Sequence, residues 1–344
     1  MKCALFLVLA FTFGSCWKVP DVPQIAPEIP TEIEGLDLAF KKFEYQGIVN
    51  SLTFVDESVG FAGCWNGSIY KTTDGATTWQ KMDASSFLPI NDIFFLNGSE
   101  GWAVGGQSEC FQTGCTPAGG FILHSINGGE TWKTHSATPS KRVGLNSVYF
   151  VNSQLGFAVG FDIVLRTKDG GATWDETIIE NLSASMAQVR FFNDKVGLVR
   201  CTAGKFIRTT DGGESWELPN PLTQQGANSL SIINDVAFSV SYVSLNRSED
   251  FGQTWHTTPV FSENVYSIDF VSETIGFAFG MGDWSGEGDG GYAMGSIHYT
   301  LDGGQTWKGS RRVRELTSIS IATSASPKVF YAFSGSTIVK ITLQ

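Results

Sequence analysis

Short hydrophobic runs separated by polar, Gly-rich turns recur along the chain from about residue 37 onward. The clearest unit comprises residues 145–150 (LNSVYF), 156–160 (GFAVG) and 163–166 (IVLR). These runs are too short for stable helices, and they carry the β-branched and aromatic residues that favour strands. A polar segment ending in Trp174 follows, and a further strand begins after that Trp. The pattern predicts four-stranded antiparallel units that repeat along the chain.

A polar octapeptide occurs six times, each time before the last expected strand of a unit. The copies are residues 72–79 (TTDGATTW), 125–132 (SINGGETW), 167–174 (TKDGGATW), 209–216 (TTDGGESW), 248–255 (SEDFGQTW) and 300–307 (TLDGGQTW). They share the Asp-box pattern S/T-x-D-x-G-x-S/T-W, which is found in β-propellers. Its acidic or amide residues are Asp74, Asn127, Asp169, Asp211, Asp250 and Asp302, and its tryptophans are Trp79, Trp132, Trp174, Trp216, Trp255 and Trp307.

The residue types of the Asp-box suit a tight turn. Asp accepts hydrogen bonds from backbone N–H groups, Gly adopts positive φ, and Trp buries a large apolar face. We therefore interpret these aspartates as structural rather than as acids or metal ligands. In the first box Ala76 stands at a Gly position, which predicts either strain in that turn or a shift of the glycine role to Gly75.

The spacing of the repeats predicts the number of blades. A seventh unit, residues 316–344, lacks a box and has only three strand-like runs, while residues 38–44 form a lone strand before the first unit. Pairing that strand with the seventh unit would close the ring and satisfy both sheet edges. Residues 37–344 give 44 residues per blade for seven blades, close to the 42-residue spacing of the central boxes. We expect an all-β, seven-bladed propeller of four-stranded blades, closed by the N-terminal strand.

The boxes and the phrases GFAG (60–63), GWAVG (101–105) and GFAVG (156–160) resemble those of the photosystem II assembly factor family, Ycf48/HCF136-like. The resemblance covers nearly the whole chain after residue 36. It implies a seven-bladed propeller that assists the assembly of membrane complexes by binding partner polypeptides, without catalysis. It does not carry the photosystem itself over to this chain, because such propellers are also widespread in bacterial lipoproteins.

The N-terminal segment has the features of an export signal. Residues 1–15 contain Lys2 and then a short apolar run, and FGSC (13–16) resembles a bacterial lipobox with Cys16 as the lipid-attachment site. Residues 16–36 carry four prolines and read as an extended tether, so the propeller domain begins at residue 37. We expect an exported lipoprotein of the outer membrane, on the periplasmic side rather than the cell surface.

Charge excludes one class of partner. The 344-residue chain has a net charge of −11 and no block of Lys or Arg, which speaks against nucleic-acid binding. Nothing in the sequence indicates a cofactor.

Two insertions lie between second and third strands and should decorate one face of the propeller. The first, residues 107–120, contains Cys110 and Cys115, which we expect to form a disulfide in an exported protein. Cys64 and Cys201 fall in blades that are not neighbours, so we expect buried free thiols.

The second insertion, residues 281–295, is acidic and aromatic. Asp283, Glu287 and Asp289 could bind Ca²⁺, although a solvated acidic loop fits the spacing better. The candidate partner-binding residues on this face are Phe111, Trp284, Tyr292, Lys141, Arg142, Arg311, Arg312 and Arg314. Solvated loop charge is the alternative for the basic clusters.

The leading functional hypothesis is a non-catalytic, lipid-anchored interaction and assembly module that binds other envelope and membrane proteins. One alternative is a glycan-binding lectin that uses Trp65, Phe111, Trp284 and Tyr292, so a glycan or other small molecule stays a possible ligand. A less favoured alternative is a sialidase- or xyloglucanase-like glycoside hydrolase, in which a pair such as Asp162 and Asp283 would act. The chain lacks the N-terminal Arg-Ile-Pro of sialidases and has one propeller rather than two.

Overall fold

A computed structural model describes most of the chain after residue 31. The described residues are 32–33, 36–43, 47–84, 86, 88–111, 114–134, 144–180, 182, 184–218, 227–281, 295–313, 320–323, 329–334 and 337–344. The expected signal peptide, Cys16 and most of the tether lie outside them. No helix in the described ranges is long and apolar enough to cross a membrane.

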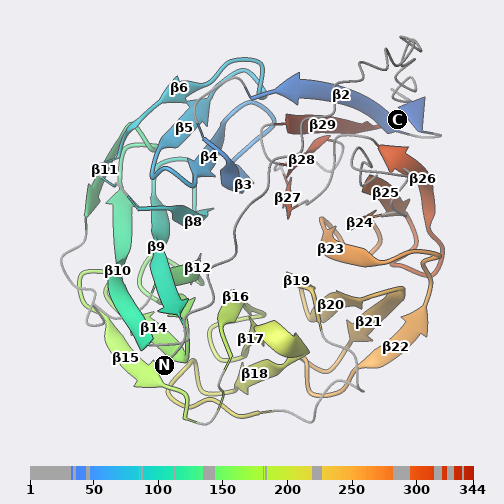
Figure 1. Ribbon diagram of the computed structural model, residues 1–344. Helices are drawn as coiled ribbons and strands as arrows, with labels where there is room; N and C mark the ends of the chain where they lie inside the picture. Colours follow the sequence, from blue (N-terminus) through green and yellow to red (C-terminus); the bar gives the residue numbers. More distant parts are fainter. Residues whose placement is uncertain are drawn as a thin grey trace, which may run out of the picture.

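Seven sheets, antiparallel except for the parallel pairing of β7 with β11 in blade 2, surround a central axis, as expected for a seven-bladed propeller (Figure 1). Blade 1 comprises β3 (Val49–Phe54), β4 (Gly60–Cys64), β5 (Ile69–Thr72) and β6 (Gln80–Lys81). Blade 2 comprises β8 (Ile90–Phe95), β9 (Gly101–Phe111), β10 (Gly114–Ser125), β11 (Thr131–Thr134) and the edge strand β7 (Asp83–Ala84). Blade 3 comprises β12 (Leu145–Phe150), β13 (Gly156–Gly160), β14 (Ile163–Thr167) and β15 (Asp175–Ile178). Blade 4 comprises β16 (Met186–Phe191), β17 (Gly197–Cys201) and β18 (Phe206–Thr209). Blade 5 comprises β19 (Ser229–Ile233), β20 (Val236–Ser241), β21 (Ser244–Ser248) and β22 (His256–Pro259). Blade 6 comprises β23 (Val265–Phe270), β24 (Gly276–Met281), β25 (Gly295–Thr300) and β26 (Lys308–Val313).

Blade 7 joins the two ends of the propeller. It consists of β27 (Ser320–Thr323), β28 (Val329–Ser334), β29 (Thr337–Leu343), β2 (Leu36–Lys42) and β1 (Glu32–Ile33). β2 runs antiparallel to β29, with Leu36 opposite Leu343 and Lys42 opposite Thr337. The predicted closure by an N-terminal strand is therefore confirmed, and strand pairing begins at Glu32, within the segment expected to be tether.

Blade 4 departs from the four-stranded pattern. It has three strands, and an isolated bridge between Arg208 and Glu217 takes the place of the fourth. A one-turn 3₁₀-helix, η1 (Thr202–Gly204), connects β17 to β18.

Aromatic side chains fill the space between blades. Trp102 of blade 2 stacks on Phe150 of blade 3 with ring centroids 3.5 Å apart, and Phe238 of blade 5 stacks on Phe270 of blade 6 at 3.6 Å. In five blades a glycine opens the second strand, namely Gly60, Gly101, Gly156, Gly197 and Gly276. This glycine makes room for the packing; a Cβ on Gly156, for example, would lie 2.4 Å from the Phe150 ring. The repeated GF/GW phrases of the sequence are thus a packing signature: a glycine beneath one ring, followed by the ring that contacts the next blade.

The six Asp-box segments form turns at one end of the blades. In blade 3, Thr173 donates to Asp169 through its backbone N–H (2.8 Å) and its hydroxyl (2.6 Å), while the Gly171 N–H donates to the Thr167 hydroxyl (2.8 Å). These hydrogen bonds lower the pKa of the Asp169 carboxyl to about 2. The other boxes repeat the backbone contact. In the box with Asn127 the side-chain contact is reversed, and the Asn127 amide donates to the Thr131 hydroxyl at 3.0 Å.

The first box adopts the conformation of the others despite its alanine. Gly75 has φ 68° and Ala76 has φ 66°, matching 74° and 94° at Gly170 and Gly171. Ala76 is therefore held in the left-handed region that alanine disfavours, so the predicted strain is present rather than relieved by Gly75.

Candidate interaction face and central channel

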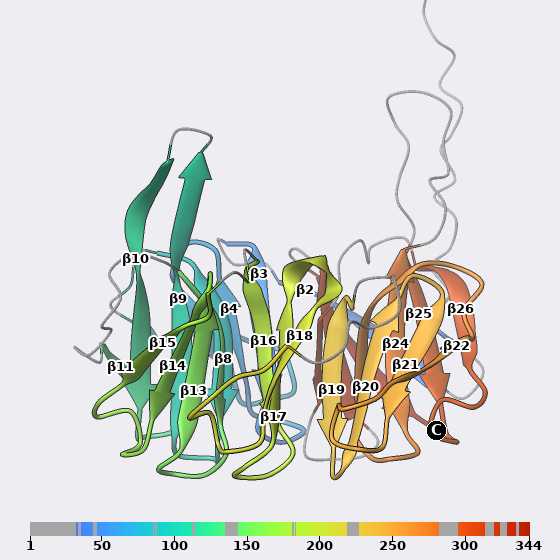
Figure 2. The same cartoon turned by 90° about the horizontal axis from the view of Figure 1, so that it is seen from below.

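The blades present two different ends. The Asp-box turns occupy one end, and the turns between second and third strands occupy the other. At the latter end β9 and β10 extend well beyond the other strands (Figure 2). We call this end the hairpin face.

The first insertion is a continuation of the sheet rather than an irregular loop. β9 and β10 stay paired out to Phe111 and Gly114, with a bulge between Ala118 and Phe121. Their register places Cys110 directly opposite Cys115. This backbone arrangement brings together the two residues of the expected disulfide.

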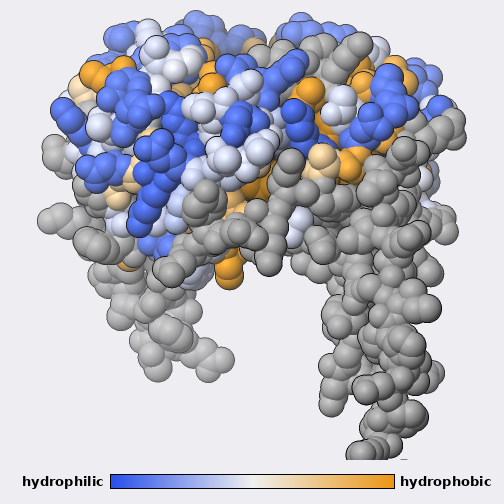
Figure 3. Space-filling model, turned by 90° about the horizontal axis from the view of Figure 1, so that it is seen from above, coloured by the Kyte–Doolittle hydropathy of each residue, from blue (hydrophilic) through white to orange (hydrophobic). Residues whose placement is uncertain are grey.

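Several exposed hydrophobic side chains lie at turns of the hairpin face. Trp65 (54 % exposed) follows β4. Its backbone N–H donates to the backbone carbonyl of Ile48 (61 % exposed) at 2.9 Å. Tyr242 (53 %) follows β20, and its carbonyl accepts a 2.8 Å hydrogen bond from the N–H of Val265, beside the exposed Tyr266. Phe161 adds a fifth exposed side chain after β13. The side of the outer rim that Figure 3 shows carries many hydrophilic residues, with hydrophobic ones scattered among them.

The other sequence-predicted face residues are only partly placed. Arg311 and Arg312 belong to β26, and Arg311 pairs with Ser296 near the hairpin-face end of that blade, so they stand in an outer strand rather than in a connection between blades. The remaining candidates lie outside the described residues, namely Lys141, Arg142, Arg314, Trp284, Tyr292, Asp283, Glu287 and Asp289. The described residues contain no cluster of three or more potential metal ligands.

The two cysteines that the structure describes outside the hairpin match their prediction. Cys64 and Cys201 are free and fully buried at the ends of β4 and β17. Burial raises the pKa of each thiol to about 12, so neither is a reactive nucleophile.

The innermost strands of the blades enclose a central channel with a cavity of about 480 Å³. Its wall is polar, with a run of amide and hydroxyl side chains on successive strands. Asn91 donates to the Leu145 carbonyl of the next blade at 2.9 Å, and Asn146 donates to the Met186 carbonyl at 2.8 Å. Asn50 and Asn228 make the same link to Ile90 and Val265 at 3.3 Å.

A second set of links lies one residue further along each strand. The Ile93 N–H donates to the Ser51 hydroxyl at 3.1 Å, and the Leu230 N–H donates to the Gln188 side chain at 3.0 Å. In blade 2 the linking residue is Asp92, which accepts from the Ser147 hydroxyl (2.9 Å) and its neighbouring N–H (3.1 Å). Together the two sets link each of blades 1 to 5 to the next blade along the channel wall.

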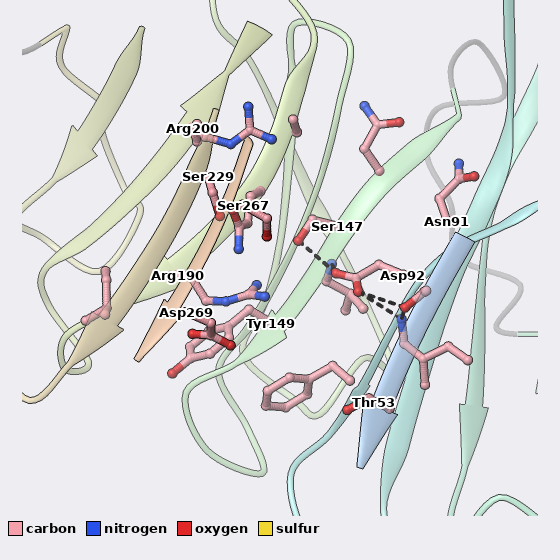
Figure 4. A pocket seen from close by; sticks show the side chains of 18 of the residues that line it. Thr53, Asn91, Asp92, Ser147, Tyr149, Arg190, Arg200, Ser229, Ser267 and Asp269 are labelled. Atoms are coloured by element: carbon pink, nitrogen blue, oxygen red, sulfur yellow. Dashed lines mark hydrogen bonds between the residues drawn. The ribbon is translucent and has the colours of Figure 1, made fainter. Parts of the chain in front are cut away.

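Charged side chains project into the same channel (Figure 4). Arg190 of β16 lies beside Asp269 and the ring of Tyr149, with its guanidinium 5.7 Å from that ring's centre. Arg200 of β17 lies nearer to Ser229 and farther along the wall. Burial lowers the pKa of Arg200, and the positive charge of Arg190 lowers it further.

Two carboxylates of the channel have raised pKa values, a feature that a hydrolase would also require. Burial raises the pKa of Asp269 to about 6 and raises that of Asp92. Both are already engaged, however: Asp269 accepts from the Ser231 hydroxyl at 2.7 Å, and Asp92 links blades. Asp162, the described member of the pair considered for hydrolysis, accepts from the Ala184 N–H at 3.3 Å in a turn of the hairpin face. These contacts assign structural roles to all three.

Sequence reasoning missed the channel residues. The blade-linking residues do repeat in the sequence, as NSL at 50–52, NDI at 91–93, NSV at 146–148 and NSL at 228–230. That repeat could have been found beside the more conspicuous Asp-box. The two channel arginines belong to no motif, and only the fold brings them together.

Comparison with known proteins supports the resemblance. The chain is 25 % identical over 323 residues to the photosystem II assembly lipoprotein Ycf48 of Synechococcus sp. (strain CC9902), covering 88 % of this chain and 85 % of that protein. No family model matches the chain. Among solved structures, YCF48 bound to D1 peptide superposes with a TM-score of 0.66 at 15 % identity, covering 89 % of this chain and 97 % of the other.

Structural likeness alone does not select a function. Streptogramin B lyase superposes equally well, with a TM-score of 0.67 at 10 % identity over 89 % of this chain and 98 % of the other. Such likeness shows the fold, whereas the sequence similarity to Ycf48 runs through nearly the whole propeller. The chain is a Ycf48-like seven-bladed propeller, as the boxes and GF/GW phrases indicated.

Proposed function

We propose that this chain is a non-catalytic interaction module that binds a polypeptide partner through its hairpin face. The observation that carries the proposal is the set of exposed apolar side chains at that end, above all the adjacent pair Ile48 and Trp65 and the neighbouring Tyr242 and Tyr266. Exposed apolar side chains that gather at one end of a rigid scaffold are typical of an interaction site.

The relatives support the same role. One is named as an assembly lipoprotein, and a similar structure is described as bound to a peptide. By analogy, the partner of this chain is a polypeptide of a membrane complex in the cell envelope. Phe111 and the basic residues Arg311 and Arg312 extend the proposed face along the hairpin and blade 6.

A lipid anchor would hold this face near its partner. We propose acylation of Cys16, with residues 16–31 as the tether to the outer membrane and the propeller on the periplasmic side. Replacement of Cys16 by Ser should move the protein from the membrane fraction to the soluble fraction. Mass spectrometry of the N-terminal peptide should show the acyl chains only in the unmodified sequence, and retention of the Ser variant in membranes would contradict the anchor.

The interaction face can be tested with variants matched for exposure. Trp65→Glu combined with Tyr242→Glu places two charges on the hairpin face, whereas Ile126→Glu combined with Leu301→Glu places two charges at the Asp-box end, where both side chains are also exposed (73 % and 52 %). Tagged proteins would be crosslinked in their own membranes, purified in detergent and compared by quantitative mass spectrometry.

We expect the hairpin-face variant to lose at least tenfold of a specific partner while the Asp-box-end variant retains it. Equal recovery of partners by both variants would contradict the proposal. The same two variants distinguish the lectin alternative on a glycan array, because saturable glycan binding that depends on Trp65 would favour a lectin over a protein-binding module.

A further inference from the structure

The central channel has the size and polarity of a site for a small polar ligand. Its cavity of about 480 Å³ falls within the range of roughly 300–1,000 Å³ that is usual for small-molecule sites. Asn, Ser, Gln, Tyr, Arg and Asp side chains from six blades line it. A polar wall of this kind favours a ligand that forms hydrogen bonds and carries charge.

The two arginines supply more hydrogen-bond donors than the protein uses. A guanidinium carries five N–H donors. Arg190 donates through Nη1 to the Val189 carbonyl at 2.7 Å, and Arg200 donates through Nη1 to the Ala227 carbonyl at a long 3.4 Å. Nε of Arg200 is buried without a partner. Most of the donor capacity of this pair is therefore not used in hydrogen bonds to the described residues.

Protein carboxylates act on these cations without direct ion pairs: the charge of Arg190 lowers the pKa of both Asp92 and Asp269, against the larger effect of burial. Within the described part of the chain, neither Asp92 nor Asp269 forms an ion pair within 4.0 Å of either guanidinium. Asp92 instead accepts a hydrogen bond from the Ser147 hydroxyl in the link between blades, and Asp269 accepts one from the Ser231 hydroxyl. The two arginines also repel each other, since the charge of one lowers the proton affinity of the other.

Arg190 and Arg200 are held at fixed positions in the wall. β16 and β17 pair with Arg190 opposite Leu198 and Arg200 opposite Gln188, so the two side chains leave neighbouring strands two residues apart along the sheet. An oxyanion between them would accept hydrogen bonds from both forks and remove their mutual repulsion.

We propose that the channel is a binding site for a small oxyanion, a carboxylate or phosphate group, held by Arg200 and Arg190 with hydroxyls of the wall as further donors. Ser267 and Tyr149 are hydroxyl-bearing residues near the two arginines in Figure 4, whereas the Ser229 hydroxyl already donates to the Ile268 carbonyl at 3.1 Å. This site lies inside the ring. Of the exposed side chains of the hairpin face, Tyr266 also lines the cavity, whereas Ile48, Trp65, Phe161 and Tyr242 do not. The site goes beyond the proposed partner binding.

Calorimetry on the detergent-purified full chain tests the site. Sodium phosphate and sodium citrate would be titrated separately at constant ionic strength, which distinguishes the phosphate source from the carboxylate source. We expect saturable 1:1 binding of at least one anion, weakened at least tenfold by Arg200→Ala and by Arg190→Gln. Arg166→Ala is the matched control, because Arg166 pairs with Glu214 at 2.7 Å near the Asp-box end.

A second readout protects the test against misfolding. The bound anion should raise the thermal unfolding midpoint of the unmodified chain and of Arg166→Ala, but not that of the channel variants. Arg200→Lys keeps the charge without the fork, so it should restore part of the affinity that Arg200→Ala loses.

Three outcomes would overturn the proposal. The first is the absence of saturable heat with either anion, and the second is unchanged affinity in both channel variants. The third is binding only of a peptide with a free C-terminal carboxylate while phosphate and citrate fail, which would assign the channel to the partner-binding surface.

Discussion

Asp92 in blade 2 accepts a 2.9 Å hydrogen bond from the Ser147 hydroxyl in blade 3. The carboxylate also accepts from the Val148 N–H at 3.1 Å, and Ser51 of blade 1 lies within 3.4 Å of its other oxygen. One side chain thus connects three consecutive blades at the channel wall. Blades 1 and 3 carry Ser at the corresponding position, so the carboxylate in blade 2 makes contacts that a hydroxyl could only partly replace.

Asp92→Ala should destabilise the propeller. The change leaves the Ser147 hydroxyl and the Val148 N–H without their acceptor, and each buried group left unpaired costs about 1–3 kcal/mol. We expect a loss of about 2–4 kcal/mol in the free energy of unfolding, measured by urea denaturation. Asp92→Ser is the control and should lose less, because it installs the residue of the neighbouring blades. Equal stability of the alanine variant and the unmodified chain would show that the link is dispensable.

Ala76→Gly should stabilise the first Asp-box turn. Ala76 has φ 66°, a conformation that costs an L-residue about 1–2 kcal/mol and glycine nothing sterically, although glycine loses more entropy on folding. We expect a net gain of about 0.5–1 kcal/mol, read from the shift in denaturation midpoint.

The reverse change in blade 3 is its control. Gly171 has φ 94°, and a Cβ there would lie 3.3 Å from Nε1 of Trp102. Gly171→Ala should therefore destabilise by about 1–3 kcal/mol. A loss of stability in Ala76→Gly would mean that the buried methyl group outweighs the backbone strain.

The sequence predicts the blades well because their signals are local and repeated. An Asp-box forms its hydrogen bonds within five residues, as between Asp169 and Thr173, so the turn can be recognised from the sequence alone. Ring closure was predictable because Leu36–Lys42 is a strand with no partner of its own, and β29 offers the free edge.

The channel site was not predictable in the same way. Arg190 and Arg200 are ten residues apart on two strands, with nothing in their neighbours to mark them. Their shared cavity depends on where β16 and β17 stand relative to five other blades. The length of the β9–β10 hairpin was also missed, since Gly114, Pro117 and Gly119 suggest a loop while the register continues through them with a bulge.

Stability should depend on pH with two opposing contributions. The box carboxyls of Asp74, Asp169, Asp211 and Asp302 have folded pKa values of about 2, below the ordinary 3.8, because they accept hydrogen bonds within their turns. Their contribution is present above about pH 4 and is lost as pH falls toward 2. Asp269 behaves oppositely: burial raises its pKa to about 6, so the folded state binds the proton more tightly than the unfolded chain.

The contribution of Asp269 should therefore fall as pH rises from about 4 to 6 and stay constant above that range. A shift of this size corresponds to about 3 kcal/mol. Asp269→Asn should make the decline in stability between pH 4 and 6 shallower, as measured by urea unfolding at a series of pH values, while leaving the steep loss below pH 4. Burial also raises the pKa of Asp92, so part of the decline should remain in the variant. A decline as steep in the variant as in the unmodified chain would place the titration on another group.

The state of the cysteines gives the most direct test of the hairpin. The register sets Cys110 opposite Cys115, a separation along paired strands that a disulfide can span, whereas Cys64 and Cys201 are buried as thiols with pKa values raised to about 12. Alkylation of the native oxidised protein, followed by peptide mass spectrometry, should label none of these four residues. Denaturation without a reductant should expose Cys64 and Cys201 only, and a reductant should add the hairpin pair.

The disulfide should also protect the hairpin against proteolysis, because it limits opening of the strands at their tip. Cys110→Ser combined with Cys115→Ser should be cleaved within residues 107–118 at least several-fold faster than the unmodified chain. Cys64→Ser, which changes a buried thiol in blade 1, serves as the control and should leave the cleavage rate of the hairpin unchanged. Alkylation of Cys110 or Cys115 in the native oxidised protein would show that the two opposed residues do not form the bond.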